Sequence, residues 1–281
     1  MKGGARALRP LLLLPTAAWV AAFFLVPLAM IVAYSFATIS LITLDVSFGL
    51  SLANYRELFD PLYLSTLGRS VVLALGATAG CLVLALPLAF FISRQPPRWQ
   101  RVLLVAVIVP FWSSFIVRIY AVARVIDDGG PLEDALWALS IGSGDLGLAQ
   151  TRWAIGVGIV YSYLPLMVLP IYVALDRVDR SLLDAAADLG APARRGFRRV
   201  TLPLALPGVL AGCVIVGIPA LGEYVIPDVL GGGKTLMLGN VVADQFLKTG
   251  NLPFGSAVAV ALLAVMAIVL IGQRLARQVV R

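Results

Sequence analysis

The chain has 281 residues, of which 60% are hydrophobic and only 13% are charged. Soluble domains carry about 25% charged residues, so this composition indicates an integral membrane protein. In such a protein the net charge of +7 reports topology and does not indicate nucleic-acid binding. Histidine is absent and both cysteines lie inside apolar runs. We therefore expect no metal site and no histidine-based catalysis.

Six apolar runs are long enough to cross about 30 Å of hydrocarbon. They predict transmembrane helices at about 11–36, 70–93, 102–123, 153–175, 204–222 and 254–272. The first run is longer than the ~7–15 apolar residues of a signal peptide, so we interpret it as a retained span. The third run is the least regular, because Arg118 interrupts it. The predicted fold class is an all-α integral membrane protein, with one transmembrane domain over residues 1–281.

The basic residues predict the orientation of the chain. With six spans, 15 of the 22 lysines and arginines lie on the same side as the N-terminus. Cytoplasmic segments of membrane proteins carry the excess of lysine and arginine. We therefore expect a multi-pass protein with both termini in the cytoplasm.

Residues 176–203, here called the elbow, form a polar segment between the fourth and fifth runs. Ser181 is the expected N-cap of a short helix, and Gly190 suits the left-handed position that ends it. Pro192 suits the start of a second short helix, which carries Arg194–Arg199 at headgroup level. One apolar stripe is expected from Leu182, Leu183, Ala186 and Leu189. By physics alone, the elbow is equally compatible with an ordinary amphipathic loop at the membrane surface.

The elbow also contains a sequence motif with a characteristic spacing of residues. Asp184-Ala185-Ala186 is followed by Gly190 and, after nine further residues, by Val200-Thr201-Leu202-Pro203. This pattern resembles the signature of permease subunits of binding-protein-dependent ABC importers, although the usual family form begins with Glu. The resemblance implies a type I ABC importer permease fold, in which this segment is a coupling helix that docks on a cytoplasmic ATPase. The docking residues it implies are Asp184, Ala185, Ala186, Leu189 and Gly190.

Two further stretches, residues 110–120 and 218–247, resemble those of spermidine/putrescine permeases. The resemblance implies a permease subunit that forms half of the translocation pathway for a polyamine in the bacterial inner membrane. It also implies a second permease, a homodimer of ATPase subunits and a periplasmic substrate-binding protein as partners, beside membrane lipid. The chain has no phosphate-binding loop. We therefore expect no enzymatic activity of its own, with ATP and Mg²⁺ bound by the partner ATPase.

A polyamine is a flexible polycation, so its pathway requires carboxylates and aromatic faces. Glu223 and Asp228, at the outer end of the fifth run, are the candidate carboxylates of the pathway. Trp112 and Tyr224 are the aromatic candidates, with Tyr161 behind them. Tyr163 stands behind them as a further aromatic candidate. Arg118 is interpreted as a structural or loop-pairing cation, and the sequence leaves open whether it pairs with Glu223 or Asp228.

Other functions remain open at this point. The same machinery could import another small solute, such as an amino acid derivative or an opine-like compound. A stand-alone secondary transporter and an intramembrane enzyme are the alternatives from other classes. The enzyme is disfavoured because no Ser or Asp pair stands at a catalytic spacing and histidine is absent.

Overall fold

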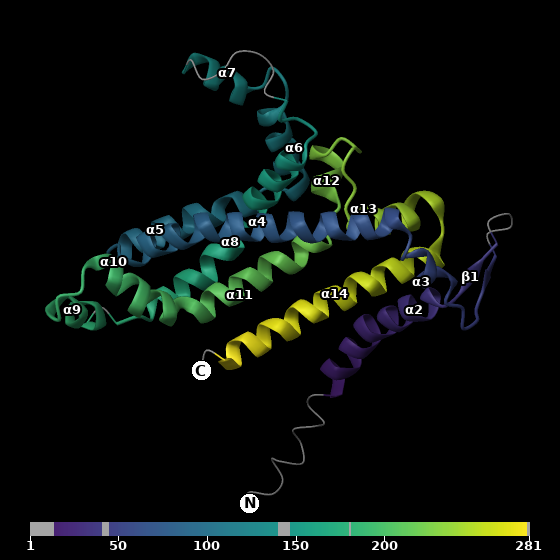
Figure 1. Ribbon diagram of the computed structural model, residues 1–281, viewed down its shortest axis with the longest axis horizontal. Helices are drawn as coiled ribbons and strands as arrows, with labels where there is room; N and C mark the ends of the chain where they lie inside the picture. Colours follow the sequence, from purple (N-terminus) through teal and green to yellow (C-terminus); the bar gives the residue numbers. More distant parts are fainter. Residues whose placement is uncertain (1–13, 41–44, 140–146, 180, 280–281) are drawn as a thin grey trace, which may run out of the picture. The chain divides into compact units, whose positions relative to one another are not determined.

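The computed structural model describes residues 14–40, 45–139, 147–179 and 181–279, and it is almost entirely helical (Figure 1). Among these residues, five helices are long and apolar enough to span a membrane, or six if one bent helix pair counts as a span. The one departure from the expected all-α fold is a two-stranded antiparallel ribbon of β1 (Thr38–Ile39) and β2 (Val46–Ser47). Residues 11–13 of the first predicted span lie outside the described part.

The chain divides into two compact units, and the divisions fall within three helices, α4 (Pro61–Ser93), α13 (Leu238–Asp244) and α14 (Leu252–Val279). The first unit contains the chain up to Leu64 together with Val241–Ala264. Its elements are η1 (Ala21–Leu25), α2 (Val26–Ser35), the ribbon, α3 (Ala53–Glu57), η4 (Gln245–Thr249) and the start of α14 (Leu252–Val279). Asn54 ties α3 to the end of α2, because its side-chain amide donates to the carbonyl oxygens of Ser35 and Ala37 at 3.0 and 2.8 Å.

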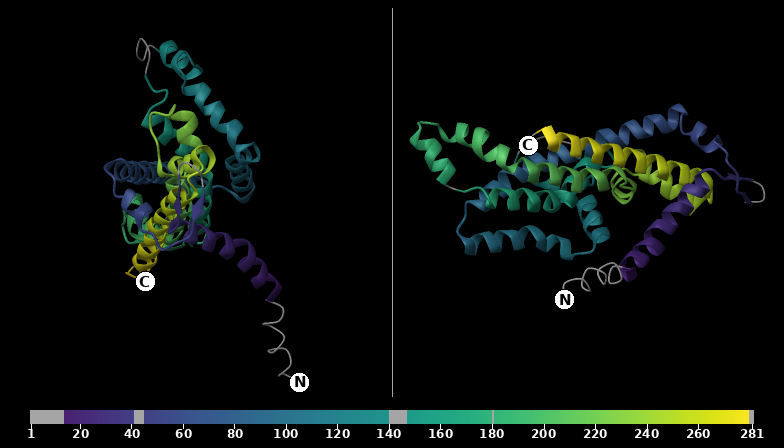
Figure 2. Two further views of the ribbon diagram at one scale, coloured as in Figure 1. Left: turned by 90° about the vertical axis from the view of Figure 1, so that its right-hand side faces the viewer. Right: turned by 90° about the horizontal axis from the view of Figure 1, so that it is seen from below.

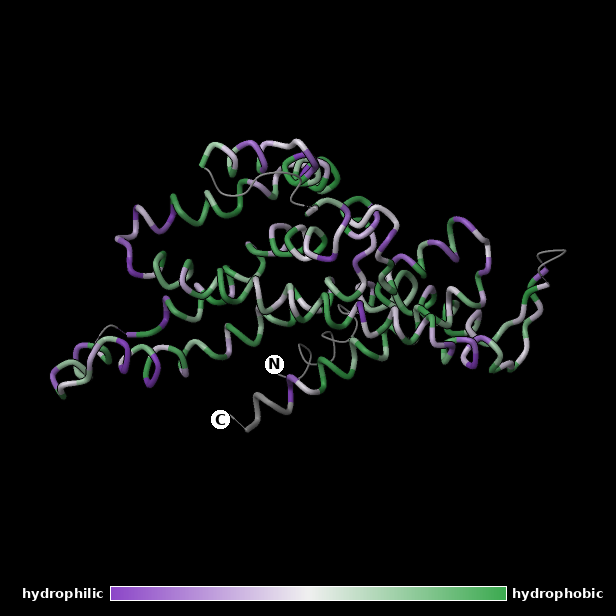
Figure 3. Tube along the Cα trace, turned by 45° about the horizontal axis from the view of Figure 1, so that its top comes forward, coloured by the Kyte–Doolittle hydropathy of each residue, from purple (hydrophilic) through white to green (hydrophobic). Residues whose placement is uncertain are grey.

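The second unit is built on three long helices that lie side by side, α4 (Pro61–Ser93), α8 (Arg152–Asp176) and α11 (Leu202–Leu221) (Figures 1 and 2). Their facing sides form one buried apolar core, which includes Cys81, Ile92, Met167, Ile171 and Val209. Hydrophilic residues gather where the long helices end (Figure 3).

Small residues allow α8 and α11 to approach closely. A Cβ atom at Gly208 would lie 2.5 Å from the carbonyl oxygen of Pro170 and from the Cβ atom of Ala174. One at Gly212 would lie 2.6 Å from the sulfur of Met167. Helices in membranes associate by this kind of close backbone packing, because apolar side chains gain little by leaving lipid.

The third predicted span is not one straight helix. α5 (Pro97–Ile108) continues into η2 (Val109–Trp112), and α6 (Phe115–Ile126) then leaves at an angle of 94°. Pro110 has no N–H with which to continue the helical ladder. The chain then becomes extended at Ser113, which leaves the carbonyl oxygen of Pro110 for other donors. Ser113 Oγ and Arg118 donate to that oxygen at 2.7 and 2.8 Å. The single continuous helix expected over 102–123 is therefore replaced by a broken one.

Arg118 stabilises this break by contacts other than an ion pair. Its guanidinium lies 4.7 Å from the ring centre of Phe111 and 5.8 Å from that of Phe115. No ion pair among the described residues involves Arg118. The pairing of Arg118 with Glu223 or Asp228 that the sequence left open is therefore not formed in this structure.

The remaining helices are shorter and connect or cap the long ones. They are α7 (Pro131–Ala138), α9 (Ser181–Asp188), α10 (Ala193–Gly196), η3 (Phe197–Thr201), α12 (Val225–Leu230) and α13 (Leu238–Asp244). α9 and α10 lie at one end of the α4, α8 and α11 group, and α12 lies towards the other (Figure 1).

Candidate functional site

The elbow folds as two short helical segments, and Gly190 ends the first as the sequence predicts. Gly190 has a φ of 75°, and its N–H donates to the carbonyl oxygen of Ala187 at 2.8 Å. The N–H of Ala191 donates to the carbonyl oxygen of Ala186 at 3.0 Å. These two hydrogen bonds define a Schellman motif, which satisfies the last carbonyl groups of α9 and turns the chain sharply.

The start of α9 differs from the prediction. Ser181 is the first residue of the helix and not its cap, and its N–H donates to Oδ1 of Asp179 at 2.9 Å. Hydrogen bonds from the backbone and the hydroxyl of Ser181 lower the pKa of the Asp179 carboxyl. Asp179 therefore satisfies the N–H of the first residue of α9, whereas we expected Ser181 itself to provide the capping side chain.

The apolar residues of α9 are divided between two faces and do not form the single stripe expected. Leu183 and Ala186 turn toward the rest of the elbow and are partly buried. Leu182 and Leu189 face away from it, with exposed fractions of 46% and 89%. Ala185 is exposed beside them. The described chain therefore leaves an apolar face of α9 uncovered.

Aromatic contacts fix the elbow to the end of α4. The rings of Phe90 and Phe197 meet edge to face, with centroids 5.1 Å apart and an interplanar angle of 80°. The guanidinium of Arg94 lies 4.9 Å from the ring centre of Phe90. Leu183 and Gly196 line the same junction. A displacement of α9 would therefore be transmitted through η3 to α4 and α11.

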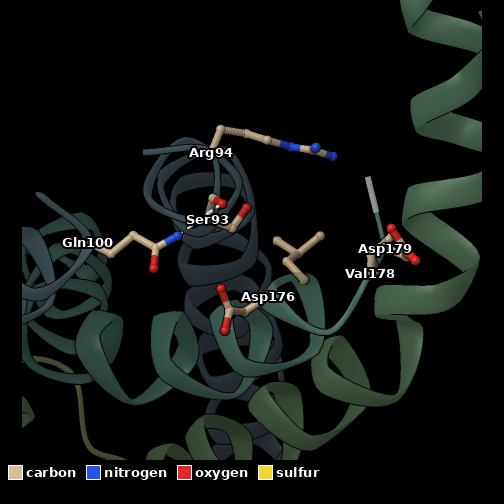
Figure 4. Close-up of a pocket in the computed structure, with 7 residues that line it drawn as sticks. Ser93, Arg94, Gln100, Asp176, Val178 and Asp179 are labelled. Carbon is tan, nitrogen blue, oxygen red and sulfur yellow. Dashed lines mark hydrogen bonds between the residues drawn. The ribbon is translucent and has the colours of Figure 1, made fainter. Parts of the chain in front are cut away.

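A polar cavity of about 250 Å³ lies where the elbow leaves α8 (Figure 4). Arg94 extends along one side of it, Asp176 lies at the end of α8, and Asp179 lies on the segment that follows α8. Gln100 connects the helices around the cavity, because its side chain donates to the carbonyl oxygen of Ser93 at 3.2 Å and accepts from Tyr172 at 3.2 Å. The junction between elbow and long helices thus combines one apolar and one polar contact zone.

At the other end of the α4, α8 and α11 group, Glu223 organises the chain between α11 and α12. Its Oε1 accepts the N–H groups of Tyr224, Val225 and Ile226 at 3.1, 3.0 and 3.3 Å. Its Oε2 accepts the hydroxyl of Tyr163 at 2.6 Å. Glu223 is only 7% exposed. Its carboxylate therefore stabilises the first turn of α12 and anchors that turn to α8.

α13 closes over the same segment. The side-chain amide of Asn240 donates to the carbonyl oxygen of Tyr224 at 2.8 Å, and its oxygen accepts the N–H of Met237 at 3.1 Å. A Cβ atom at Gly239 would lie 2.4 Å from the carbonyl oxygen of Gly222. Glycine is required at this approach. Gly239 and Asn240 were not among the predicted site residues, although both fall in the 218–247 stretch that resembles spermidine/putrescine permeases.

The other predicted pathway residues lie at the surface. Trp112 is 82% exposed, and Tyr161 and Tyr224 are 45% and 47% exposed. Asp228 is exposed on α12. Within the described residues, the structure brings Glu223 together with Tyr163 and the Tyr224 backbone, but no hydrogen bond or ring contact joins Trp112, Tyr161 and Asp228. These three side chains remain available to a ligand, lipid or second subunit.

Comparison with known proteins defines the class to which this fold belongs. Residues 82–281 match the family described as binding-protein-dependent transport system inner membrane component. The chain belongs to this family and is therefore a multi-pass inner membrane protein that serves in transport and is not itself an enzyme.

Individual relatives show which members of this family the chain resembles. The chain is 39% identical over 256 residues to the spermidine/putrescine transport system permease protein PotB of Haemophilus influenzae, covering 90% of this chain and 88% of the relative. It is equally similar to PotB of Escherichia coli K12, with 92% of that protein covered. Among solved structures, a bacterial alginate ABC transporter in complex with an alginate-bound periplasmic protein contains a chain of the same fold, with a TM-score of 0.76 at 13% identity. The alignment covers 98% of this chain and 95% of that one.

Proposed function

We propose that the chain is a polyamine permease subunit of an ATP-driven importer, with α9 as its coupling helix. The observation that carries the coupling role is the apolar face of α9, which a Schellman turn holds rigidly and no described residue covers. Asp184, Ala185, Ala186, Leu189 and Gly190 form the docking element, with Leu189 as its most exposed apolar side chain. Docking would bury Leu189, and full burial of a leucine side chain stabilises a contact by about 1.5–3 kcal/mol.

The orientation and partners follow from this role. Both termini and the elbow lie in the cytoplasm, where the basic residues concentrate. A homodimer of ATPase subunits binds ATP and Mg²⁺ and docks on α9, while a second, homologous permease supplies the other half of the pathway. A periplasmic binding protein delivers the cargo to the outer end. The two compact units act as one transmembrane domain, because α4 and α14 each run through both of them.

The proposed cargo is a polyamine such as putrescine or spermidine, a proposal supported by the 39% identity to two PotB proteins. The structure divides the candidate pathway residues by role. Asp228, with the aromatic faces of Trp112, Tyr161 and Tyr224, is free to contact ammonium groups, and each cation–π contact contributes about 0.5–2 kcal/mol. Glu223 acts as a positioning residue, because its carboxylate already accepts four hydrogen bonds.

The second candidate is the same machinery with another small solute as cargo, such as an amino acid derivative or an opine-like compound. The same fold occurs in an importer of an acidic polysaccharide, so this fold is compatible with cargoes other than polyamines. That neighbour has a TM-score of 0.75 at 15% identity, so it shares the fold alone.

Uptake by proteoliposomes tests the cargo directly. The chain would be reconstituted with its second permease, ATPase and binding protein, and ¹⁴C-putrescine and ³H-spermidine would be offered with ATP inside the vesicles. We expect ATP-dependent uptake that unlabelled polyamine abolishes and that neutral or anionic solutes leave unchanged. Uptake that an amino acid derivative competes away, with polyamine ineffective, would establish the second candidate. Uptake without ATP would contradict both.

A further inference from the structure

The outer face of the second elbow segment is a concentrated patch of positive charge. Pro192, Arg194, Arg195, Arg198 and Arg199 line a surface depression of about 500 Å³, here called the arginine basin. All four arginines are exposed. Among the described residues, none of them lies within 4.0 Å of a carboxylate. Four like charges within six residues repel one another, so this patch is costly unless an anion occupies it.

The arginine basin is separate from the face that holds the elbow together. Ala193, Gly196, Phe197 and Thr201 line the cavity against Phe90 and α9. The arginines occupy the other positions of α10 and η3 except Val200, and the two sets share no residue. The guanidinium groups therefore point away from the apolar junction and do not contribute to it.

Helix length places the arginine basin at the membrane surface. Ala193–Leu221 is one continuous helical stretch of 29 residues. At 1.5 Å per residue it is about 43 Å long, whereas the hydrocarbon core is about 30 Å thick. The apolar part, Leu202–Leu221, has 20 residues and fills that thickness. The arginines therefore lie within about 13 Å of the hydrocarbon edge, at the depth of lipid phosphate groups.

We propose that the arginine basin binds an anionic phospholipid of the adjacent leaflet, with a preference for a lipid that carries two phosphate groups. Guanidinium groups bind phosphate oxygens in a bidentate manner, and a double phosphate matches two pairs of arginines. Basic clusters directly beside a transmembrane helix attract acidic headgroups in this way. The proposal requires only that the chain spans a membrane and does not depend on the cargo.

A bound lipid would also set the position of the coupling helix. Gly196 packs against Leu183 of α9, since a Cβ atom at Gly196 would lie 3.4 Å from Cδ2 of Leu183. A headgroup that holds α10 and η3 at the membrane surface therefore holds α9 at a fixed distance from it. This consequence, unlike lipid binding itself, rests on the proposed function of α9: through this contact, the lipid composition of the leaflet would regulate ATPase coupling.

Native mass spectrometry of the purified full-length chain in detergent tests the proposal. The probes are cardiolipin, phosphatidylglycerol and phosphatidylethanolamine, titrated into the wild type and into two double variants. Arg195→Gln/Arg199→Gln removes two charges from the arginine basin. Arg98→Gln/Arg101→Gln removes two exposed charges from α5, at the same end of α4, and is the matched control.

We expect wild-type affinity to fall in the order cardiolipin, phosphatidylglycerol, phosphatidylethanolamine. Each basic residue near an acidic surface changes affinity about fivefold, so the basin variant should bind cardiolipin about 25-fold more weakly. The α5 control should stay within about twofold of wild type, since its charges lie outside the basin. Arg195→Lys/Arg199→Lys should recover much of the lost affinity, which a misfolded variant would not do.

Three results would overturn the proposal. One is equal cardiolipin affinity for the wild type and the basin variant. A second is full competition by inorganic phosphate at equal concentration, which would make the basin a site for free anions. The third is unchanged lipid binding with lost ATPase association in the basin variant, which would assign the arginines to an acidic protein surface.

Discussion

Gly190 is the residue on which the geometry of the coupling helix depends. Its φ of 75° is left-handed, and the space around it is open, so a side chain there meets backbone strain and no clash. Gly190→Val should cost about 1–2 kcal/mol at this position and loosen the end of α9. We expect the variant to insert normally and to lose most polyamine-stimulated ATP hydrolysis in the reconstituted complex.

The control for this prediction is Gly190→Asn, because asparagine tolerates the left-handed conformation better than other side chains. It should retain most of the stimulated ATP hydrolysis. Equal, wild-type activity of the valine and asparagine variants would show that the Schellman turn is not needed for coupling.

Glu223 and Asp228 are two neighbouring carboxylates for which the structure predicts opposite phenotypes. Glu223→Ala removes the acceptor of four hydrogen bonds, and each hydrogen bond to a charged group contributes about 1.5–3 kcal/mol. We expect a large fall in the midpoint of thermal unfolding in detergent, with a smaller fall for Tyr163→Phe. Asp228→Ala should change stability by less than about 1 kcal/mol and reduce polyamine uptake.

The two variants also test the separate roles assigned to Glu223 and Asp228. If Glu223→Ala unfolds at the wild-type temperature, its carboxylate is not the structural anchor described above. If Asp228→Ala imports putrescine at the wild-type rate, the exposed carboxylate of α12 is not part of the pathway.

For single residues, the sequence predicts local backbone conformation but not contacts between distant parts of the chain. The positive φ of Gly190 was predictable, because a glycine after a short polar helix has one common use. The burial of Glu223 was not, because its partner Tyr163 lies 60 residues away in the sequence. A carboxylate near the end of an apolar run looks the same whether it faces a substrate or caps a helix. Only the fold distinguishes the two.

At the scale of elements, the contact between α8 and α11 depends on glycine. Gly208→Ala would place its Cβ atom 2.5 Å from the backbone of Pro170, and overpacking of this kind costs about 1–3 kcal/mol. Gly156, on α8, has nothing within 4 Å of an added Cβ atom. Gly156→Ala should therefore be neutral or slightly stabilising.

Thermal unfolding of both variants in the same detergent measures this difference. A lower midpoint for Gly208→Ala alone is expected. Equal midpoints would mean that α8 and α11 separate easily, and that their close approach is not a source of stability.

The elements themselves were largely predictable, since long apolar runs specify membrane helices through length alone. The prediction for the second span began at residue 70, whereas α4 begins at Pro61, where Oδ1 of Asp60 accepts the N–H of Leu62 at 2.9 Å. Hydropathy marks the part of a helix inside hydrocarbon and not its full length. The break in the third span was not predicted, because a proline in a helix is compatible with either a kink or a break. The break is stabilised by the hydrogen bonds that Ser113 and Arg118 donate to the carbonyl oxygen of Pro110.

In the whole molecule, α9 is the proposed connection to the ATPase of a partner subunit. Family membership establishes a transport component. The connection itself rests on one exposed apolar face at the tip of a rigid elbow. A substitution on that face therefore tests whether the ATPase docks there.

ATP-dependent putrescine uptake by the reconstituted complex, compared between Leu189→Asp and Leu50→Asp, tests this claim most directly. Both leucines are highly exposed, at 89% and 95%, so neither substitution disturbs a core. Leu189→Asp should abolish uptake and release the ATPase during purification, because a charge would enter an apolar docking cleft. Leu50→Asp should import at the wild-type rate. Full uptake by Leu189→Asp, with the ATPase still bound, would contradict the central claim.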